Sequence, residues 1–490
     1  MSLDLSQEKF AQLLQDSNEL ILQHFEGVHE IKGYQSYPQE VVESWFDEEL
    51  PKEGMGADQL LKEVKEKVVD PATGNLGPHM YAYVMGGGTQ MSIVAEQIAA
   101  TINQNNTKWH LAPSMHEIEK RVILWTSELM QLPAHQAGVM VSGGSAANLA
   151  GLQVARNIFF EKLHIRRKGL FGQKPFMVYA SNEVHGCVDK SLDTLGIGLD
   201  NIRRLPVDQE FKLDLAALEQ QIQQDMADGY QPFCIIGNAG TVNTGAIDDL
   251  NAMADLAEKY QLWFHVDGAY GGLASAIPSL RKEYKGIERA DSIALDFHKW
   301  LYQPFEAGCL LVRDYDTLKR SYFKKADYLD TSFEPDQGKR IDFNEHYFQL
   351  SRNAKAFKVW MSLKFYGADK IVDMIKQDID LTHYLAKRIK ESDDFTLKAT
   401  SELAVACFQY TGGLSEPDKI IQLNQQLIPA LEEDGRVFIA GTRLKGEFVI
   451  RACLINHRKT EETTDYLLDT IRELGQVILT KKQKSSASTF

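Results

Sequence analysis

Two patterns of apolar residues take turns along the chain. One is a short continuous apolar run, and the other is a segment with apolar residues at helical spacing. Short apolar runs have the length of buried strands and occur at 137–141, 176–180, 233–236, 262–266 and in the run that starts at Asp291. Segments between them, such as 250–260, repeat apolar residues at helical spacing. Short strands that alternate with helices are typical of βαβ units. We therefore predict an α/β fold in which helices flank a mostly parallel sheet.

The two ends of the chain have different patterns. Apolar residues at helical spacing over 7–25 predict an amphipathic arm, which packs either on its own domain or on a second subunit. After a predicted helix at 351–366, strands within 397–409 and 446–454 and a helix at 460–474 predict a smaller α+β domain. We expect a disordered tail at 481–490. The predicted division is an arm at 1–78, a large domain at 79–367 and a small domain at 368–490.

Composition narrows the class of protein. A chain of 490 residues with 44% hydrophobic residues can bury a large core. The net charge of −15 argues against a nucleic-acid or acidic-membrane partner, because no basic surplus exists to neutralise phosphates. Five scattered cysteines without metal-ligand spacing predict reduced thiols and no metal site. The N-terminus does not resemble a signal peptide and no apolar run approaches membrane-spanning length, so we expect a cytoplasmic protein.

A glycine-rich turn follows the first predicted strand. The run 142–148 reads Ser-Gly-Gly-Ser-Ala-Ala-Asn and opens a helix. Free backbone N–H groups and the helix dipole at such a start favour an anion, and Ser145 adds a hydroxyl. Alternatively, Ser145 is only a helix cap. The run has neither the ending of a P-loop nor the spacing of a dinucleotide fingerprint.

Polar side chains recur after the later strands as well. His185, Asp267, His298 and Lys299 each follow or close a predicted strand. Strand ends of an open sheet meet at one edge, where ligands bind. A lysine amine in a partly desolvated site is a useful nucleophile towards carbonyl groups. We therefore predict one site, with Lys299 as its reactive group.

With these residues assembled, the sequence resembles the pyridoxal-phosphate-dependent amino acid decarboxylases of the aromatic amino acid and glutamate decarboxylase group. The matching segments are 142–148, His185, 265–272, 291–300 and 351–367, with a weaker match around 451–462. The resemblance implies a fold-type I architecture, pyridoxal 5'-phosphate as cofactor, and a homodimer whose active sites lie near the subunit interface. It also implies a small-molecule amino acid as substrate.

The resemblance implies a role for each matching residue. Lys299 would be the Schiff-base lysine, Asp267 the partner of the pyridine nitrogen and His185 the ring stacked on the cofactor. Ala269 would pack under the cofactor ring. The phosphate would be held by Gly144, Ser145 and His298. We also predict cofactor contacts for Asn148 and Thr241.

Other matching positions bear on the reaction and the substrate. Tyr328 stands where aromatic decarboxylases carry a loop tyrosine that can act as a general acid. We predict substrate contacts for Tyr83, Asn105, Trp109 and Arg451. Arg451 could pair with a substrate carboxylate or form a structural ion pair.

The chain departs from the family at Gly268, Val242 and Asp296. Asp296 stands where aromatic decarboxylases commonly have asparagine. These departures bear on the fine tuning of the site and leave the cofactor expected.

The residues around Tyr83 and Asn105 leave the substrate open. We expect decarboxylation of an L-amino acid, with aromatic substrates slightly ahead of acidic ones such as glutamate, aspartate or cysteine sulfinate. Alternatives are an aromatic aldehyde synthase, against which Tyr328 argues, and a non-catalytic cofactor-binding scaffold, against which Lys299 argues.

Overall fold

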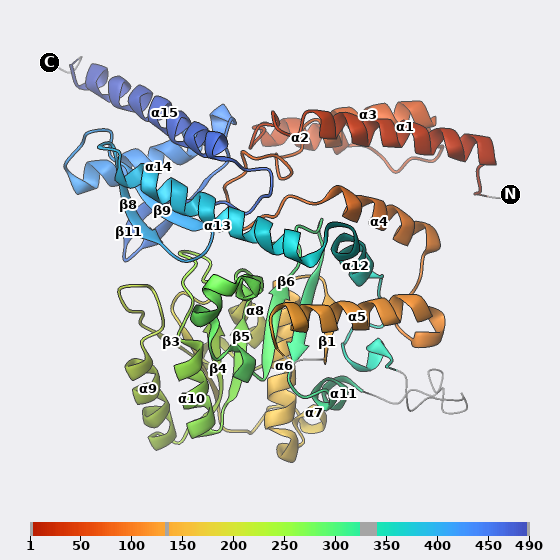
Figure 1. The fold of residues 1–490 in the computed structure, drawn as a ribbon, viewed down its shortest axis with the longest axis vertical. Helices are drawn as coiled ribbons and strands as arrows, with labels where there is room; N and C mark the ends of the chain where they lie inside the picture. The colour runs from red at the N-terminus through yellow and green to blue at the C-terminus, as the bar shows by residue number, and fades with distance from the viewer. Residues whose placement is uncertain (1–2, 133–136, 324–340, 488–490) are drawn as a thin grey trace. The chain divides into compact units, whose positions relative to one another are not determined.

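The computed structural model describes residues 3–132, 137–323 and 341–487 (Figure 1). The chain forms two compact units. The sheet unit comprises residues 86–382 and 399–406, and the terminal unit comprises the chain up to residue 85 together with 383–398 and 407 onward. Tyr328 and the end of the predicted tail, 488–490, lie outside the described residues.

A seven-stranded sheet with the order β1-β7-β6-β5-β4-β2-β3 is the centre of the sheet unit. Neighbouring pairs from β3 to β6 are parallel, and β7 is antiparallel to both β1 and β6. The sheet is therefore mostly parallel, which confirms the predicted α/β fold. The strands are β1 (Ala137–Val141), β2 (Phe176–Ser181), β3 (Ile202–Leu205), β4 (Gln231–Asn238), β5 (Trp263–Asp267), β6 (Ser292–Asp296) and β7 (Gly308–Val312).

Burial explains which strands the apolar pattern revealed. Every residue of β1, β2, β5, β6 and β7 is buried, so these strands must be apolar on both faces. The pattern missed β3, which lies at the edge of the sheet and carries Arg203 and Arg204. Arg203 pairs with the buried carboxylate of Asp225, so charge is tolerated at this edge.

Helices cover both faces of this sheet (Figure 1). Among them, α6 packs against β5, β6 and β7, while α9 and α10 pack against β4. Asp214 and Asp249 begin α9 and α10, where each carboxylate accepts a backbone N–H of the first turn. The helices before β7 are α4 (Gln90–Ile102), α5 (Pro113–Leu129), α6 (Gly144–Phe159), α7 (Ile165–Lys168), α8 (Cys187–Thr194), α9 (Leu215–Ala227) and α10 (Leu250–Tyr260), and those after it are α11 (Asp316–Tyr322), α12 (Lys355–Tyr366) and α13 (Ala368–Lys390).

The terminal unit begins with an arm of helices and holds most of a second sheet. The arm contains α1 (Gln7–Glu26), α2 (Gln39–Phe46) and α3 (Ala57–Val64). The second sheet has the order β10-β11-β9-β8, and its members are β8 (Phe395–Thr400), β9 (Val405–Tyr410), β10 (Ala440–Leu444) and β11 (Glu447–Cys453). Helices α14 (Pro417–Asp434) and α15 (Glu461–Ala487) accompany it.

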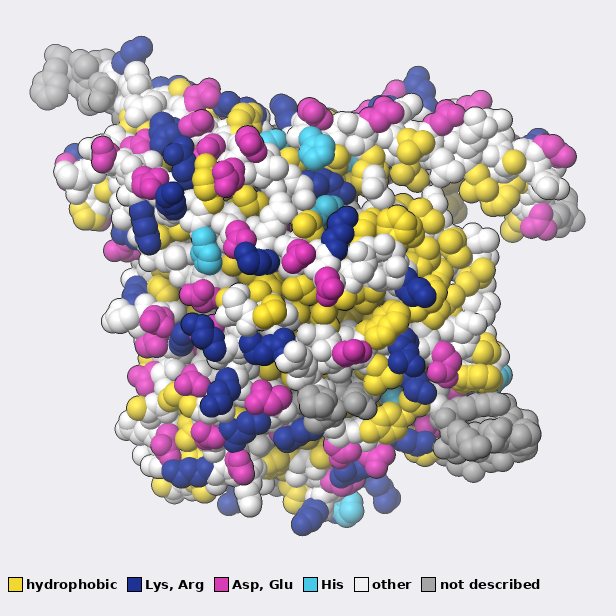
Figure 2. Space-filling model, in the orientation of Figure 1, with side chains coloured by type: hydrophobic (Ala, Val, Ile, Leu, Met, Phe, Trp, Pro, Cys, Tyr) yellow, Lys and Arg dark blue, Asp and Glu magenta, His cyan; other side chains and the backbone are white. Residues whose placement is uncertain are grey.

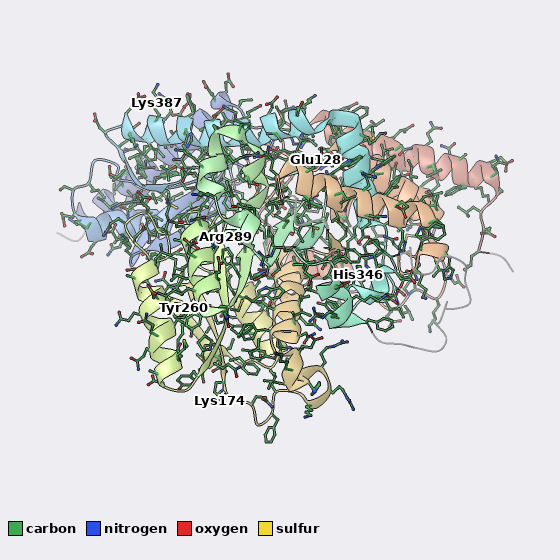
Figure 3. All side chains as sticks on the ribbon, turned by 60° about the horizontal axis from the view of Figure 1, so that its bottom comes forward. Glu128, Lys174, Tyr260, Arg289, His346 and Lys387 are labelled. Atoms are coloured by element: carbon green, nitrogen blue, oxygen red, sulfur yellow. The ribbon has the colours of Figure 1, made fainter. Side chains whose placement is uncertain are left out.

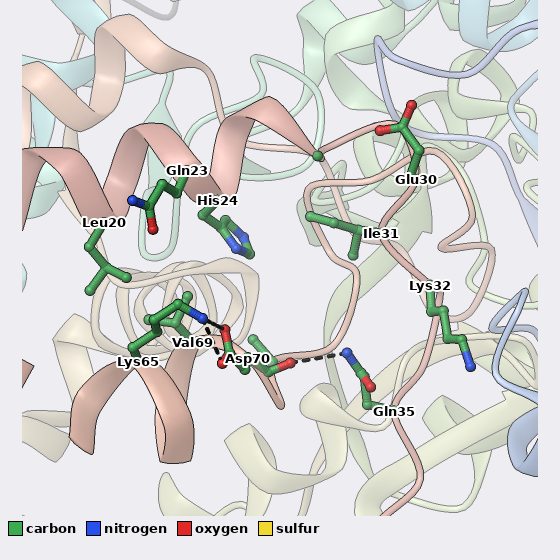
Figure 4. Close-up of a pocket in the computed structure, with 12 residues that line it drawn as sticks. Leu20, Gln23, His24, Glu30, Ile31, Lys32, Gln35, Lys65, Val69 and Asp70 are labelled. Carbon is green, nitrogen blue, oxygen red and sulfur yellow. Dashed lines mark hydrogen bonds and ion pairs between the residues drawn. The ribbon is translucent and has the colours of Figure 1, made fainter. Parts of the chain in front are cut away.

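The arm joins the rest of its unit through backbone hydrogen bonds. The N–H groups of Gly33 and Tyr34 donate to the carbonyls of Arg436 and Gly435. Beside this junction, residues of α1, of the turn at 27–35 and of the segment at 65–72 line a cavity of about 470 Å³ (Figure 4). The cavity contains none of the predicted site residues.

Two predictions for the C-terminal part need correction. The helix expected at 351–366 begins only at Lys355. The helix expected at 460–474 continues to Ala487, so residues 481–487 are helical and not a disordered tail. Lysine and serine are compatible with a helix. The prediction of a disordered tail followed from their polarity alone, so it missed the extension of α15. No helix within the described part of the chain is long and apolar enough to cross a membrane.

Candidate active site at the carboxyl edge of the sheet

The topology brings the predicted site residues to one edge of the sheet unit. Strands β1, β2, β4, β5 and β6 point the same way, because β7 is antiparallel to both β1 and β6. Their carboxyl ends therefore meet at one edge. Each end is followed by predicted site residues, which are Ser145 after β1, His185 after β2, Thr241 after β4, Asp267 on β5, and His298 with Lys299 after β6.

Lys299 lies next to a carboxylate at this edge. Its Nζ is 3.2 Å from Oδ2 of Asp296, the last residue of β6. The same oxygen is 3.4 Å from Nε2 of His298. Burial lowers the pKa of His298, the Asp296 carboxylate opposes this effect and the Lys299 charge adds to it. Two nitrogen-bearing side chains thus share one buried carboxylate.

A buried aspartate fixes the turn that follows Lys299. Oδ2 of Asp378, on α13, accepts hydrogen bonds from Trp300 Nε1 at 3.1 Å and from the Tyr302 hydroxyl at 2.7 Å. All three side chains are buried, and Tyr302 has a left-handed backbone with φ of 52°. Hydrogen bonds to a charged acceptor are stronger than neutral ones, so Asp378 holds two residues of the turn after Lys299 firmly.

Asp267 and His185 have local contacts that orient them. The Ala269 N–H donates to Oδ1 of Asp267 at 3.1 Å. The Cys187 N–H donates to Nδ1 of His185 at 3.1 Å, so Nδ1 is an acceptor and the ring orientation is fixed. The His185 ring itself is exposed at the sheet edge.

The Cys187 thiol marks where these groups converge. Its pKa is raised to about 12, because burial and the Asp267 carboxylate raise it more than Lys299 and a hydrogen bond with Ser145 lower it. The thiol is therefore neutral and inert at physiological pH. Its electrostatic contact with Asp267, Lys299 and Ser145 shows that the ends of β1, β5 and β6 face one space.

The start of α6 lies against the Asp296 carboxylate. A Cβ on Gly144 would stand 2.7 Å from Asp296 Oδ2 and 2.7 Å from the Ala269 Cβ. A Cβ on Gly143 would stand 3.1 Å from Cε1 of His298. A side chain at Gly144 would clash with Asp296 and Ala269, and one at Gly143 would be tight against His298, so the two glycines let the helix start approach the end of β6 this closely.

Asn148 takes part in a buried chain of hydrogen bonds behind this helix start. Its Nδ2 donates to the Gly144 carbonyl at 2.9 Å, and its Oδ1 accepts from His265 Nε2 at 2.8 Å. His265 Nδ1 then pairs with the Ser292 hydroxyl at 2.8 Å. Burial lowers the pKa of His265 to about 4, so the ring is neutral. Asn148 thus links α6 to β5 and β6, and the cofactor contact expected of it stays a prediction.

Thr241 is also engaged within its own loop. Its hydroxyl accepts the Ala246 N–H at 3.1 Å and pairs with the Thr244 hydroxyl at 3.0 Å. Both threonines are buried. These contacts hold the loop after β4, and the predicted cofactor contact of Thr241 remains untested.

The segment with Asn105 and Trp109 is anchored by a buried ion pair. Nη2 of Arg352 donates to Oε1 of Glu119 at 2.6 Å, with both side chains almost fully buried. The Arg352 N–H donates to Oδ1 of Asn105 at 3.1 Å, and the Trp109 N–H donates to Oδ1 of Asp342 at 2.8 Å. These two hydrogen bonds join the segments 105–109 and 342–352, and the ion pair ties the second segment to α5. His346, labelled in Figure 3, is buried in the second segment.

Tyr83 and Arg451 belong to the terminal unit. Nη1 of Arg451 donates to the Tyr83 carbonyl at 2.8 Å, and the arginine is buried. Tyr83 has a left-handed backbone with φ of 59°, and its side chain is 61% exposed. A structural role of Arg451 is therefore visible, while its role towards a substrate remains a prediction.

The residues at the sheet edge fit pyridoxal phosphate. A lysine amine and a carboxylate end neighbouring strands, as the aldehyde and the pyridine nitrogen of the cofactor require. The glycine-lined start of α6 offers free N–H groups to a phosphate. Oδ1 of Asp296, buried against this start, has no hydrogen-bond partner within the described part of the chain. Among the described residues, no group of three or more His, Cys, Asp or Glu side chains could hold a metal ion.

Fold and site together define a pyridoxal-phosphate-dependent enzyme of the fold-type I architecture. Residues 38–411 match the model of the pyridoxal-dependent decarboxylase conserved domain. The chain belongs to this family and is a pyridoxal-phosphate-dependent amino acid decarboxylase.

Relatives and solved structures agree with this assignment. The chain is 32% identical over 478 residues to the aromatic-L-amino-acid decarboxylase of Bacillus atrophaeus, which covers 97% of this chain and 98% of the relative. It is 28% identical to the phenylacetaldehyde synthase of Arabidopsis thaliana over 83% of each chain. The structure of mouse CSAD superimposes with a TM-score of 0.87 at 26% identity, covering 95% of this chain and 99% of that one.

Several contacts at this site were not predicted from the sequence. Asp378, Arg352 and Cys187 act on the site through partners distant in the chain or through burial. The sequence offers no signal for Asp378, because an aspartate in an amphipathic helix is usually a solvated residue. A hint existed for Arg352, which lies in a segment that resembles the family.

Proposed function

We propose that the protein decarboxylates an aromatic L-amino acid to the corresponding amine and carbon dioxide. The observation that carries this proposal is the 32% identity, over nearly the whole chain, to an aromatic-L-amino-acid decarboxylase. Curated relatives at 25–29% identity include tyrosine and tryptophan decarboxylases of plants. The shared activity of the family is decarboxylation, and the aromatic side chain is the part that needs testing.

Pyridoxal phosphate, when bound, accepts the electron pair that remains when carbon dioxide leaves the substrate. Lys299 would bind the cofactor covalently, since its amine is the nucleophile at this edge. Asp267 would hold a proton on the pyridine nitrogen, because a carboxylate stabilises the adjacent positive charge. The imidazole of His185, fixed by the Cys187 N–H, would stack on the ring.

The phosphate would lie at the start of α6. Gly144 permits close approach of the backbone there, and Ser145 and His298 supply polar side chains. Helix N-termini bind phosphates because their N–H groups lack partners in the helix. Ala269, which is buried beside Gly144, would close the other side of the ring.

A second candidate function is oxidative conversion of an aromatic amino acid to an aldehyde. Two relatives favour it, the phenylacetaldehyde synthase and a 4-hydroxyphenylacetaldehyde synthase of Rhodiola rosea at 26% identity. Tyr328, the predicted loop general acid, argues for the amine product.

The test is product analysis with purified, cofactor-loaded protein. We would supply an equimolar mixture of L-amino acids, identify products by mass spectrometry and record carbon dioxide release. Tryptamine, tyramine or phenethylamine with matching carbon dioxide supports the proposal. An amine from glutamate, aspartate or cysteine sulfinate overturns the aromatic substrate, and aldehyde with ammonia identifies the second candidate.

We also propose that the protein works as a homodimer. None of the residues in α1, α2 or α3 is buried. Large apolar side chains of the arm are exposed, and they include Leu3, Leu5, Phe10, Leu14, Leu22, Val41, Phe46, Leu50, Met55, Leu60 and Val68. An apolar surface of this extent is usually covered by a partner, and a second copy is the simplest one.

The sheet unit also carries exposed apolar side chains. Figure 2 shows hydrophobic groups gathered over α4, α5 and α12. The exposed apolar side chains of α4 and α12 include Val94, Ile98 and Phe365. Light scattering during size-exclusion chromatography would measure the mass. A mass of one chain at micromolar concentration would contradict the dimer.

The reducing cytoplasm is the proposed compartment. All five cysteines are buried free thiols. Unpaired thiols are typical of proteins kept in reducing surroundings. Cell fractionation followed by immunodetection tests this assignment.

A further inference from the structure

A chain of four hydrogen bonds runs through the interior of the sheet unit and ends at the first residue of α6. The indole Nε1 of Trp263 donates to the Ser292 hydroxyl at 2.9 Å, and this hydroxyl lies 2.8 Å from Nδ1 of His265. His265 Nε2 lies 2.8 Å from Oδ1 of Asn148, whose Nδ2 donates to the Gly144 carbonyl at 2.9 Å. All of these residues are buried. The chain therefore joins β5 and β6 to the helix start at which the phosphate is proposed to bind.

The two ends of this chain fix the direction of every bond in it. The Trp263 indole can only donate, and the Gly144 carbonyl can only accept. Asn148 therefore turns its amide nitrogen to Gly144 and its oxygen to His265, so Nε2 of the histidine donates. Burial lowers the pKa of His265 to about 4, so the ring carries one proton and Nδ1 accepts from the Ser292 hydroxyl. Every link thus donates towards α6.

The last acceptor of the chain belongs to the same peptide unit as the Ser145 N–H. In a trans peptide the C=O and the N–H point in opposite directions, so the Gly144 carbonyl faces along the helix and the Ser145 N–H faces out of its start. Ser145 is the second residue of α6, where N–H groups lack partners in the helix. Linked hydrogen bonds polarise one another, so donation to the carbonyl strengthens the N–H of the same unit. The chain therefore acts on a donor that faces the proposed phosphate.

We propose that His265 is a positioning residue for the phosphate of the cofactor. Through Asn148 it holds the peptide unit between Gly144 and Ser145, so that the N–H of this unit points at the phosphate and donates strongly. Neither His265 nor Asn148 touches the phosphate in this role, because both are fully buried and their polar atoms are engaged in the chain. The inference rests on the proposed position of the phosphate at the start of α6.

The competing explanation is that the chain only stabilises the fold. A buried network whose members are all satisfied also makes a core rigid. A purely structural chain would affect the stability of the sheet unit, but not how much the phosphate group adds to binding. The quantity that separates the two roles is the Kd of pyridoxine divided by the Kd of pyridoxine 5'-phosphate, here called the phosphate ratio. Neither compound has an aldehyde, so neither depends on covalent attachment to Lys299.

The first measurement is the phosphate ratio of Asn148→Leu by calorimetry. Leucine keeps the size of the side chain and removes its amide. We expect the ratio to fall about fivefold, because the phosphate loses a well-oriented donor, while the Kd of pyridoxine stays the same. The matched control is Asn157→Leu, which removes a buried asparagine of the same helix that donates to the Ser321 carbonyl at 3.3 Å. Its phosphate ratio should equal that of the wild type, whatever happens to its stability.

His265 itself is tested by rescue. His265→Phe fills the space without a donor and should lower the phosphate ratio as far as Asn148→Leu does. His265→Gln should restore most of it, because the glutamine amide reaches the place of Nε2 and can donate to Asn148. The double variant His265→Phe/Asn148→Leu should fall no further than either single variant, since both changes break the same path.

Ser292→Ala keeps the test open if His265→Phe does not fold, because it removes only a hydroxyl. Without that hydroxyl, Nδ1 of His265 loses its donor, and the proton is no longer confined to Nε2. We expect a lower phosphate ratio, together with a change in the nitrogen NMR signals of the ring, which show where the proton lies. A wild-type ring with its proton on Nδ1 would overturn the inference.

Phosphate ratios equal to that of the wild type in Asn148→Leu and His265→Phe would also overturn it, as would an equal fall in Asn157→Leu. Ser145→Ala separates this failure from failure of the proposed phosphate position, because its hydroxyl lies at the helix start and outside the chain. If Ser145→Ala lowers the ratio and Asn148→Leu does not, only the inference is wrong. If neither variant lowers it, both the position and the inference are wrong.

Discussion

The carboxyl edge of the seven-stranded sheet and the N-terminal arm differ in whether their side chains find partners within the chain. At the sheet edge, buried polar groups are paired within the chain, as the hydrogen bonds of Asp378 and the ion pair of Arg352 show. In the arm, α1 to α3 bury no residue, and apolar side chains such as Phe10 and Leu14 are exposed. The hydrogen bonds and the ion pair hold side chains of the first region within a single chain, whereas the apolar side chains of the second region are exposed in it.

This difference shows which features must be built within one chain and which can come from another molecule. Groups that must react precisely are held by neighbours that are themselves buried, because a fixed environment preorganises them. Apolar surface needs only to be covered, which a second copy can do. The following changes test the two regions, from the largest expected effect to the smallest.

Replacing Lys299 with alanine should abolish activity. The amine is the proposed covalent attachment point. Without it the cofactor would not be held in place or transferred to the substrate amine. Amine formation should be undetectable, and the absorbance band of lysine-bound cofactor should be absent. Lys259→Ala removes a surface lysine that pairs with Glu219 and should retain both. Retained turnover in Lys299→Ala would refute the assigned site.

Replacing Arg352 with methionine should strongly destabilise the sheet unit. The change leaves the buried Glu119 carboxylate without its cation, and breaking such a pair costs about 3–5 kcal/mol. Urea unfolding followed by fluorescence measures the loss. The matched control Arg204→Met breaks the exposed pair with Asp189, which should cost less than about 1 kcal/mol. Equal losses in the two variants would show that the Arg352 pair is no better than a surface contact.

Replacing Asp378 with asparagine should loosen the turn after Lys299. Two hydrogen bonds to a charged oxygen are weakened, each worth about 1.5–3 kcal/mol when the acceptor is charged. We expect lower stability together with a lower occupancy by the cofactor, read from absorbance after dialysis. Asp378→Ala should lower occupancy more, since it removes the acceptor altogether. A variant that is destabilised but binds the cofactor fully would separate Asp378 from the site.

Much of the sheet unit could be predicted from the sequence because its strands are buried on both faces. Runs such as 137–141 and 262–266 are continuous in apolar residues for this reason. The edge strand β3 was missed, since Arg203 there is paired with Asp225 and leaves no apolar run. Residues that follow strands, such as Asp267 and Lys299, could be assigned to one edge by topology alone.

The partners of these site residues could not be predicted in the same way. Asp378 contacts Trp300 across 78 residues of sequence, and Arg352 contacts Glu119 across 233 residues. Neither pairing has a local spacing signal, because it arises only when helices pack on the sheet. The extent of α15 was likewise missed, since polar composition does not distinguish an exposed helix from a loop.

Replacing Leu14 with glutamate should weaken association without unfolding the chain. Leu14 is exposed on α1, so its loss costs the single chain little, whereas a charge on a covered apolar surface costs a dimer at least about 1.4 kcal/mol, a tenfold change in Kd. Analytical ultracentrifugation at several concentrations measures the change. Leu199→Glu alters an exposed leucine of the sheet unit and serves as the control. Equal dissociation constants for wild type and Leu14→Glu would mean that the arm needs no partner at this position.

Replacing His116 with glutamine should reduce the acid sensitivity of the sheet unit. Burial lowers the pKa of His116 to about 4 in the folded chain, from an ordinary value of 6.5. Between these values the unfolded chain binds a proton that the folded chain refuses, so stability falls as the pH falls. Each such histidine contributes about 1.4 kcal/mol per pH unit to this slope.

Urea unfolding at several pH values between these limits should therefore give a shallower slope in His116→Gln. Glutamine can keep a contact like that of His116 Nδ1 with the Ala112 carbonyl, so stability near neutral pH should change less than the slope does. A slope equal to that of the wild type would contradict the prediction, because it would mean that the folded chain does not refuse a proton at His116.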